Sequence, residues 1–146
     1  MKSLPIPLTA MNFEDFEQMS LHSLAEIMER FHKKNAEYAS IDDVFSNFKR
    51  AAGGLSYHCK AEQVAWEYAV KHLQSVKDMI ASETSTAEAI DEKIGDVIAY
   101  MLIIKGMLYK RINYNPNYPN YEGGSDNLWS ITESLHDRLI YTLKPE

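Results

Sequence analysis

The stretch Val97-Ile98-Ala99-Tyr100-Met101-Leu102-Ile103-Ile104 decides the fold, because it is a long apolar run inside a helical pattern. A helix that is apolar on every side is usually enclosed by other helices. The Ser85-x-x-Glu88 pair has the form of a capping box, and the helical pattern continues from it to about Arg111. We therefore expect 85–111 to be the central helix of the protein. Lys105 and Gly106 end the apolar run well short of the roughly 18 residues that would span a bilayer.

Three amphipathic segments lie on either side of this helix in the sequence. Apolar residues recur at helical spacing over about 12–34, over about 61–80 and again over 126–143. Each segment therefore carries one apolar stripe along an otherwise polar helix. The pattern predicts three further long helices that dock on the central one.

Shorter segments complete the layout. A short helix with Val44, Phe45 and Phe48 as apolar contacts is expected to start at Ser40 or Asp42 as N-cap and to stop at Gly53-Gly54. Residues 1–11 contain two prolines and show no helical period, so we expect an extended arm. Residues 113–125 are rich in Tyr, Asn, Pro and Gly, which predicts a loop.

Composition and charge limit the class of protein. The 146 residues suit a single domain, 1–146, and there is no long alternating run typical of strands, so we predict an all-α bundle of four long helices and one short helix. The net charge of -6 argues against an extended nucleic-acid partner. Cys59 is the single cysteine, and no signal-peptide pattern opens the chain. We expect a cytoplasmic protein that neither spans nor needs a membrane.

A pair of carboxylates is the main candidate for chemistry. Glu92, Asp96 and Tyr100 are spaced by four residues and form one column on the central helix, at the point where polar surface runs into apolar surface. Two nearby carboxylates repel in a poorly solvated place unless a cation neutralises them. Mg²⁺ prefers such oxygen ligands and leaves room for substrate phosphates. The alternative is that both acids point to solvent and pair with lysines.

Two further clusters could contact a ligand. Lys71, Ser75 and Asp78 share one helical face and could hold phosphate and metal, with His72 beside them as a base or ligand; the alternative is a solvated face, with His72 as a wall residue. The second cluster lies at the end of the first helix and in the short helix. It comprises Lys33, Lys34, Glu37 as a metal ligand, Tyr38 or Phe48 as a stacking surface, and Asn47 and Lys49 as base or phosphate contacts. Lys33 and Lys34 are equally ordinary at a helix C-terminus.

The order of these motifs resembles a known family. Lys-Asn-Ala-Glu-Tyr-Ala at 34–39, Asn47-Phe48-Lys49, Lys71-His72-x-x-Ser75-x-x-Asp78 and Glu92-Lys93-Ile94-Gly95-Asp96-x-x-x-Tyr100 resemble the nucleotide modification associated domain 1 proteins. This phage-enriched branch is similar to the MazG-like all-α nucleoside triphosphate pyrophosphatases. The resemblance covers about residues 20–110.

The resemblance implies a MazG-like bundle that forms a homo-oligomer, a dimer or a tetramer, in the cytoplasm of the host if the chain is phage-encoded. It also implies Mg²⁺ bound by acids on two helices and cleavage of a nucleotide between its α and β phosphates, with Glu92 and Asp96 in the metal site. The family's Glu-Glu-x-x-Glu signature is absent here, since Glu26, Glu29 and Glu37 have a different spacing. A remodelled site, or binding without hydrolysis, is therefore an alternative.

The leading hypothesis is a Mg²⁺-dependent nucleotide pyrophosphohydrolase. The expected metal ligands are Glu92 and Asp96 with Glu37 or Asp78, and Lys71 joins Glu92 and Asp96 as a catalytic group. The expected substrate contacts are Lys49, Asn47, Ser75, His72, Tyr100 and Tyr38. The rival is a protein that captures a nucleotide or a nucleotide-derived signal without turnover. A purely structural bundle is the third alternative.

Overall fold

Helices form every regular element of the part of the chain that the computed structural model describes, which is residues 6–38, 42–55, 60–82 and 84–117. The elements are α1 (Phe13–Tyr38), α2 (Ser46–Arg50), the π-helical turn η1 (Ala51–Leu55), α3 (Ala61–Ala81) and α4 (Ala87–Arg111). The prediction of an all-α fold is confirmed. The expected helix 126–143 and most of the expected loop 113–125 lie outside the described residues.

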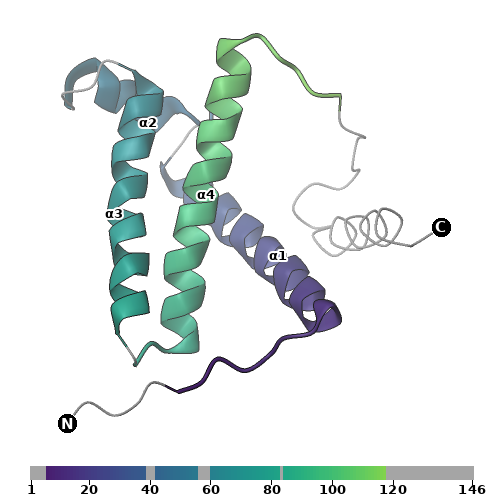
Figure 1. Cartoon of the computed structure of the whole chain (residues 1–146). Helices are drawn as coiled ribbons and strands as arrows, with labels where there is room; N and C mark the ends of the chain where they lie inside the picture. Colours follow the sequence, from purple (N-terminus) through teal and green to yellow (C-terminus); the bar gives the residue numbers. More distant parts are fainter. Residues whose placement is uncertain (1–5, 39–41, 56–59, 83, 118–146) are drawn as a thin grey trace.

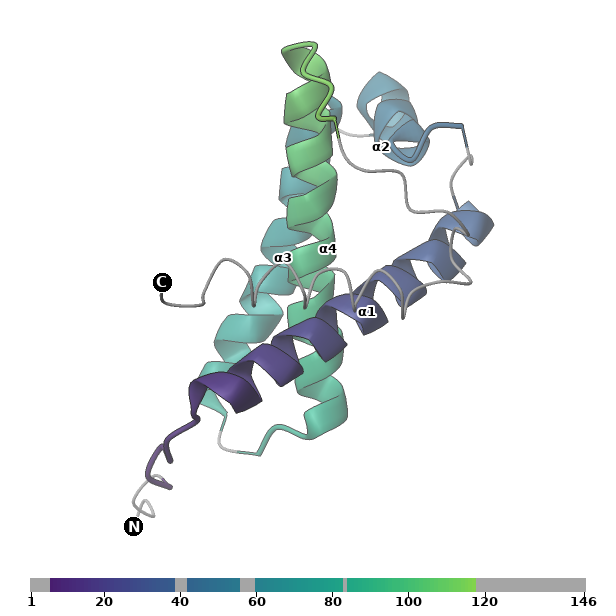
Figure 2. The ribbon, with the colours of Figure 1, turned by 90° about the vertical axis from the view of Figure 1, so that its right-hand side faces the viewer.

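The helices α3 and α4 pack side by side with opposite directions, and α1 runs from one side of α4 to behind it (Figure 1). The view turned by 90° shows that α1 runs obliquely across α4, with α2 beyond its C-terminal end (Figure 2). Asn12 caps α1, because its side-chain oxygen accepts a hydrogen bond from the Asp15 amide at 2.8 Å. The helix continues to Tyr38, beyond the expected end near residue 34, since no helix-breaking residue follows there.

The start of α4 differs by one residue from the expected capping box. Thr86, in an extended backbone conformation, is the N-cap, and its hydroxyl accepts a hydrogen bond from the Ala89 amide at 3.2 Å. Glu88 therefore lies in the first turn, one position too early to reach back as the third residue of a capping box. Either hydroxyl could fill the cap from the sequence alone, because Ser85 and Thr86 are adjacent and chemically alike.

The short helix also begins and ends differently from the expectation. Phe45 occupies the N-cap position without a side-chain cap, so Asp42 does not have that role, and Ser40 lies outside the described residues. Asp43 instead accepts a hydrogen bond from the Phe45 amide at 3.0 Å. Gly53-Gly54 does not stop the helix, because the chain passes through both glycines in the π-helical turn η1.

The core lies where α2, η1, α3 and the C-terminal half of α4 meet. Its buried residues are Phe48, Ala51, Ala61, Val64, Ala65 and Met107. Small alanines on α3 let the two long helices approach closely. At the rim of this core Arg111 donates two hydrogen bonds to the Glu62 carboxylate, at 2.9 and 3.0 Å, which joins the start of α3 to the end of α4.

A glycine lies where α1 crosses α4. Gly95 is buried, and a Cβ added to it would clash with the Arg30 guanidinium and would lie 3.4 Å from Ile27. Arg30 also donates a hydrogen bond to the Asp91 carbonyl at 3.1 Å. The absence of a side chain at this position therefore leaves room for the Arg30 guanidinium against α4.

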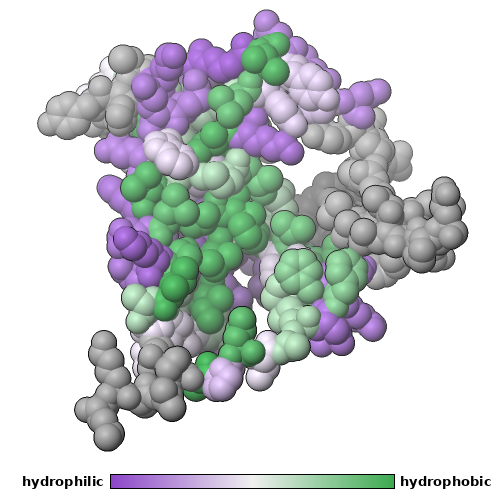
Figure 3. Space-filling model, in the orientation of Figure 1, coloured by the Kyte–Doolittle hydropathy of each residue, from purple (hydrophilic) through white to green (hydrophobic). Residues whose placement is uncertain are grey.

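The expectation that α4 is enclosed on every side is wrong. Its exposed apolar residues are Ile90, Ile94, Met101, Leu102 and Leu108. Figure 3 shows apolar surface extending over α3 and α4 on the face turned to the viewer. Sequence pattern alone cannot separate a side chain that is covered within the chain from one that is left exposed. None of the described helices is both long and apolar enough to cross a membrane.

Candidate functional site

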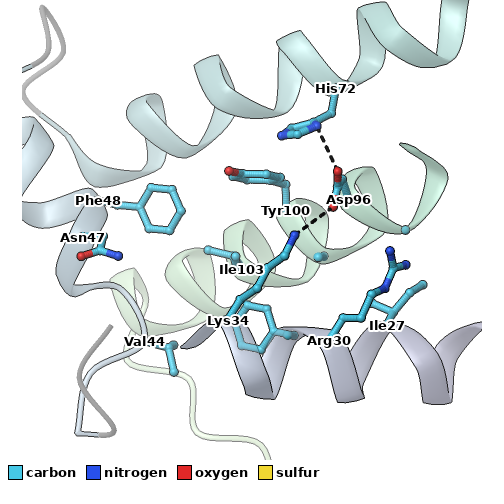
Figure 4. Close-up of a pocket in the computed structure, with 13 residues that line it drawn as sticks. Ile27, Arg30, Lys34, Val44, Asn47, Phe48, His72, Asp96, Tyr100 and Ile103 are labelled. Carbon is cyan, nitrogen blue, oxygen red and sulfur yellow. Dashed lines mark ion pairs between the residues drawn. The ribbon is translucent and has the colours of Figure 1, made fainter. Parts of the chain in front are cut away.

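A cavity of about 320 Å³ lies between α1, α2, α3 and α4 on the side away from that apolar surface. Figure 4 shows side chains from all four helices directed toward it. Arg30 and Lys34 come from α1, Asn47 and Phe48 from α2, His72 from α3, and Asp96 and Tyr100 from α4. We call it the Asp96 cavity. Its size is at the lower end of the range of small-molecule sites, about 300–1,000 Å³.

Asp96 lies between two groups that carry or can carry positive charge. Its side chain is only 18% exposed, and its carboxylate oxygens are 3.7 Å from Lys34 Nζ and 3.4 Å from His72 Nδ1 (Figure 4). Both distances exceed those of tight charge-assisted hydrogen bonds, about 2.7–2.9 Å. The two partners are therefore close enough to compensate the carboxylate and loose enough to turn toward a ligand.

Aromatic rings form the wall next to this carboxylate. His72 and Tyr100 stack with ring centroids 5.0 Å apart and planes 28° apart, and Phe48 meets Tyr100 edge-on at 6.2 Å. Burial raises the pKa of the Tyr100 phenol above its usual value, and the negative charge of Asp96 raises it further. The phenol therefore stays protonated at neutral pH and is available as a hydrogen-bond donor.

Glu92 does not share the cavity with Asp96. Its side chain is 60% exposed, its nearest described ion-pair partner is Lys93 at 4.0 Å, and it is absent from the lining of the cavity. Lys34 and His72 lie beside Asp96, whereas Glu92 lies one helical turn closer to the N-terminus of α4. The expected site, with both carboxylates in one crevice, is therefore not what the geometry brings together.

Only His72 of the expected cluster on α3 lines the cavity. Asp78 is exposed and accepts a hydrogen bond from Gln74 at 2.9 Å. The Ser75 hydroxyl donates to the Lys71 carbonyl at 3.3 Å, and Lys71 Nζ lies 5.8 Å from the centre of the Tyr68 ring. Lys71, Ser75 and Asp78 are therefore a polar helix face outside the cavity.

The expected cluster around α2 divides between two places. Asn47 lines the Asp96 cavity and accepts a hydrogen bond from Arg50. Lys49 instead borders a separate polar hollow and forms an ion pair with Asp43, and its hydrogen bond lowers the pKa of that carboxyl. The side chains of Glu37 and Tyr38 lie outside the described residues, so their expected roles stay predictions.

Arg30 was not among the expected site residues, and Lys34 was expected only as an alternative to an ordinary helix-end lysine. Both line the cavity together with Ile27 and Phe31, at spacings of three and four residues along α1. Those spacings place the four residues on one helix face. A basic pair within the apolar stripe of an amphipathic helix was the signal that could have identified them.

The described residues do not fit the expected magnesium site. No group of three or more histidine, cysteine, aspartate or glutamate side chains gathers among them, and Asp96 is the single described carboxylate that lines the cavity. A metal centre held by Glu92 and Asp96 together therefore has no support in this geometry. Comparisons with models of protein families, with curated proteins and with solved structures found no match to the chain.

Proposed function

We propose that the Asp96 cavity binds a mononucleotide or a related nucleotide-derived small molecule. The observation that carries this proposal is the presence, in one cavity, of basic side chains and an aromatic wall around a single carboxylate. Basic side chains bind phosphate, and an aromatic wall contacts a flat base. A carboxylate accepts hydrogen bonds from hydroxyl or amide hydrogens of a sugar or a base. The modest volume suits one nucleotide better than a dinucleotide.

Each group has a definite part in this proposal. Lys34 and Arg30 compensate phosphate charge, and His72 donates a hydrogen bond to phosphate from its ring nitrogen. Tyr100 and Phe48 provide ring contacts for the base. Asp96 and Asn47 accept hydrogen bonds from the sugar or the base edge. Arg30 and Lys34 contribute two positive charges against the one negative charge of Asp96, so an anionic ligand brings the cavity closer to neutrality.

Calorimetric titration of the full chain with nucleoside mono-, di- and triphosphates, with and without Mg²⁺, tests this proposal. We expect saturable binding of at least one nucleotide, and binding that persists when EDTA removes divalent ions. The matched nucleoside without phosphate should bind more weakly, because it leaves the basic side chains unpaired. Failure of every nucleotide to bind would reject the proposal.

Mg²⁺-dependent pyrophosphohydrolysis is a second candidate. The observation that favours it is Asp96, a carboxylate inside the cavity, because Mg²⁺ is usually bound through one or two carboxylates together with substrate phosphates. Release of pyrophosphate from nucleoside triphosphates in the presence of Mg²⁺ would support it. Binding without release would support capture alone, which was the rival hypothesis from the sequence.

The remaining expectations also stay proposals. We propose a cytoplasmic location, in which nucleotides are abundant. We also propose that the chain forms a homo-oligomer. The apolar surface of α3 and α4 could join two copies, and it is separate from the proposed ligand site.

A further inference from the structure

An apolar surface covers the side of α3 and α4 opposite the Asp96 cavity (Figure 3). We call it the α3–α4 face. It contains three exposed residues of α3 and four of α4, namely Trp66, Leu73, Ile80, Ile90, Ile94, Met101 and Leu108. Contiguous apolar patches larger than a few hundred Å² are uncommon on monomeric proteins and usually mark an interaction site. The question is which partner this face fits.

The α4 part of the face has the spacing of a helix-pairing seam. Apolar residues recur at intervals of four and three residues at Ile90, Ile94, Val97, Met101, Ile104 and Leu108. This alternation is the heptad pattern by which two helices pack along their length. The series is also symmetric about residue 99. An antiparallel second α4 would therefore pair Ile90 with Leu108, and Val97 with Met101, in matching layers.

Charges beside the seam favour the antiparallel arrangement. Asp91 and Lys105 lie on the same flank of α4, fourteen residues apart, which is four turns of a paired helix. Antiparallel pairing brings Asp91 of each copy to the level of Lys105 of the other. Parallel pairing would instead place the two Asp91 carboxylates at one level and the two Lys105 ammonium groups at another.

The centre of the α3 part of the face lies level with the centre of the apolar series on α4. Trp66, Leu73 and Ile80 are spaced by seven residues, symmetrically about Leu73. The neighbouring His72 contacts both Asp96 and Tyr100 of α4, so this level of α3 lies beside residue 98. The centres of the two stripes therefore coincide to within about one residue. A single twofold axis can therefore relate both α3 and α4 to the same helices of a second copy.

We infer that the α3–α4 face is a self-association surface, on which a second copy of this chain packs with its α3 and α4 antiparallel to the first. The interface is isologous, because the same patch serves both copies. The inference is independent of the nucleotide proposal, since none of the residues on the α3–α4 face lines the Asp96 cavity.

Sedimentation equilibrium of the full chain and of Met101→Glu tests the surface. Met101 is 37% exposed within one chain, so a glutamate there can reach water in the monomer but would be buried in the dimer. We expect a wild-type dimer and a dissociation constant at least about tenfold higher in the variant. Met19→Glu is the matched control, because Met19 is an exposed methionine on α1, at 46%. It should leave the dimer intact, and circular dichroism should show that both variants are folded.

Charge reversal tests the direction of the two copies. Asp91→Lys and Lys105→Asp should each weaken the dimer, and the double variant should recover most of the loss. Within one chain the two residues are about 21 Å apart along α4, too far for a direct ion pair, so recovery must come from contact between copies.

Three results would overturn the inference. A wild-type chain that stays monomeric throughout a dilution series would mean that another occupant, such as the chain's own residues 118–146 or a different protein, covers the face. An oligomer unaffected by Met101→Glu would place the interface elsewhere. A dimer that Met101→Glu disrupts but that shows no recovery in the double charge variant would reject the antiparallel arrangement.

Discussion

At the scale of single residues, the Asp96 carboxylate is the centre on which the other cavity groups converge. It attracts Lys34 and His72, and its charge contributes to the raised pKa of Tyr100. A ligand that brings its own phosphate competes with this carboxylate for both cations. Nucleotide affinity should therefore depend on the charges of Lys34 and Asp96, and a substitution of each residue tests this.

Lys34→Ala should weaken nucleotide binding about tenfold or more, because a charge-assisted hydrogen bond contributes about 1.5–3 kcal/mol. Lys33→Ala is the matched control, since Lys33 is exposed and pairs with Glu29 at 3.5 Å instead of lining the cavity. Calorimetric titration with the same nucleotide should separate the two. Equal losses in both variants would indicate a diffuse charge effect and not a contact by Lys34.

The carboxylates of α4 should respond differently to neutralisation. Asp96→Asn should change nucleotide affinity, or turnover if there is any, at least about tenfold, because it removes the negative charge at the centre of the cavity and replaces one acceptor oxygen with an amide donor. Glu92→Gln should leave both within about twofold, since that side chain is 60% exposed and outside the cavity. The measurement is binding and pyrophosphate release with each variant. A large loss in Glu92→Gln would restore the paired-carboxylate site expected from the sequence.

At the scale of elements, the pair between Glu62 and Arg111 holds the start of α3 against the end of α4. The hydrogen bond from Arg111 is the largest cause that lowers the pKa of Glu62 below its usual 4.5. A carboxyl with a lower pKa in the folded state stabilises the fold above its unfolded pKa. That contribution is lost as pH falls below 4.5 and through the folded pKa.

Glu62→Gln should therefore lower the Tm by a few degrees at neutral pH, and the difference from wild type should shrink as the solution is acidified below pH 4.5. Thermal unfolding followed by circular dichroism at several pH values measures this. Arg111→Gln should have a similar effect, and the double variant should lose no more than either single one. An undiminished difference in acid would mean that Glu62 acts through packing and not through its charge.

The elements also show what the sequence could and could not predict. Helical spacing predicted α3 and α4 closely, because apolar side chains at that period must share one face. It could not predict which side of α4 each neighbour covers, since tertiary packing decides that. For the same reason Asp96 lies in a cavity while Glu92, on the same column, stays in solvent. Lys49 and Lys71 were expected at the site, yet Lys49 pairs with Asp43 and Lys71 lies near the Tyr68 ring, both outside the cavity.

At the scale of the whole molecule, self-association should couple stability to concentration. A dimer that dissociates on unfolding has a Tm that rises with protein concentration. We expect this rise in the wild-type chain and in Met19→Glu, and a flat dependence in Met101→Glu. Differential scanning calorimetry over a dilution series measures it. A concentration-independent Tm for a wild-type chain shown to be dimeric would mean that the subunits separate before they unfold.

The opposite placement of the Asp96 cavity and the α3–α4 face on one helix has a consequence for stoichiometry. Asp96 and Ile94, a residue of the α3–α4 face, point about 160° apart around α4, so whatever covers one side leaves the other open. In a back-to-back pair the two cavities would open outward, in opposite directions, each built from a single subunit. Each copy could then load and release its own ligand without waiting for its neighbour, and saturation would follow a simple hyperbola with one molecule bound per chain.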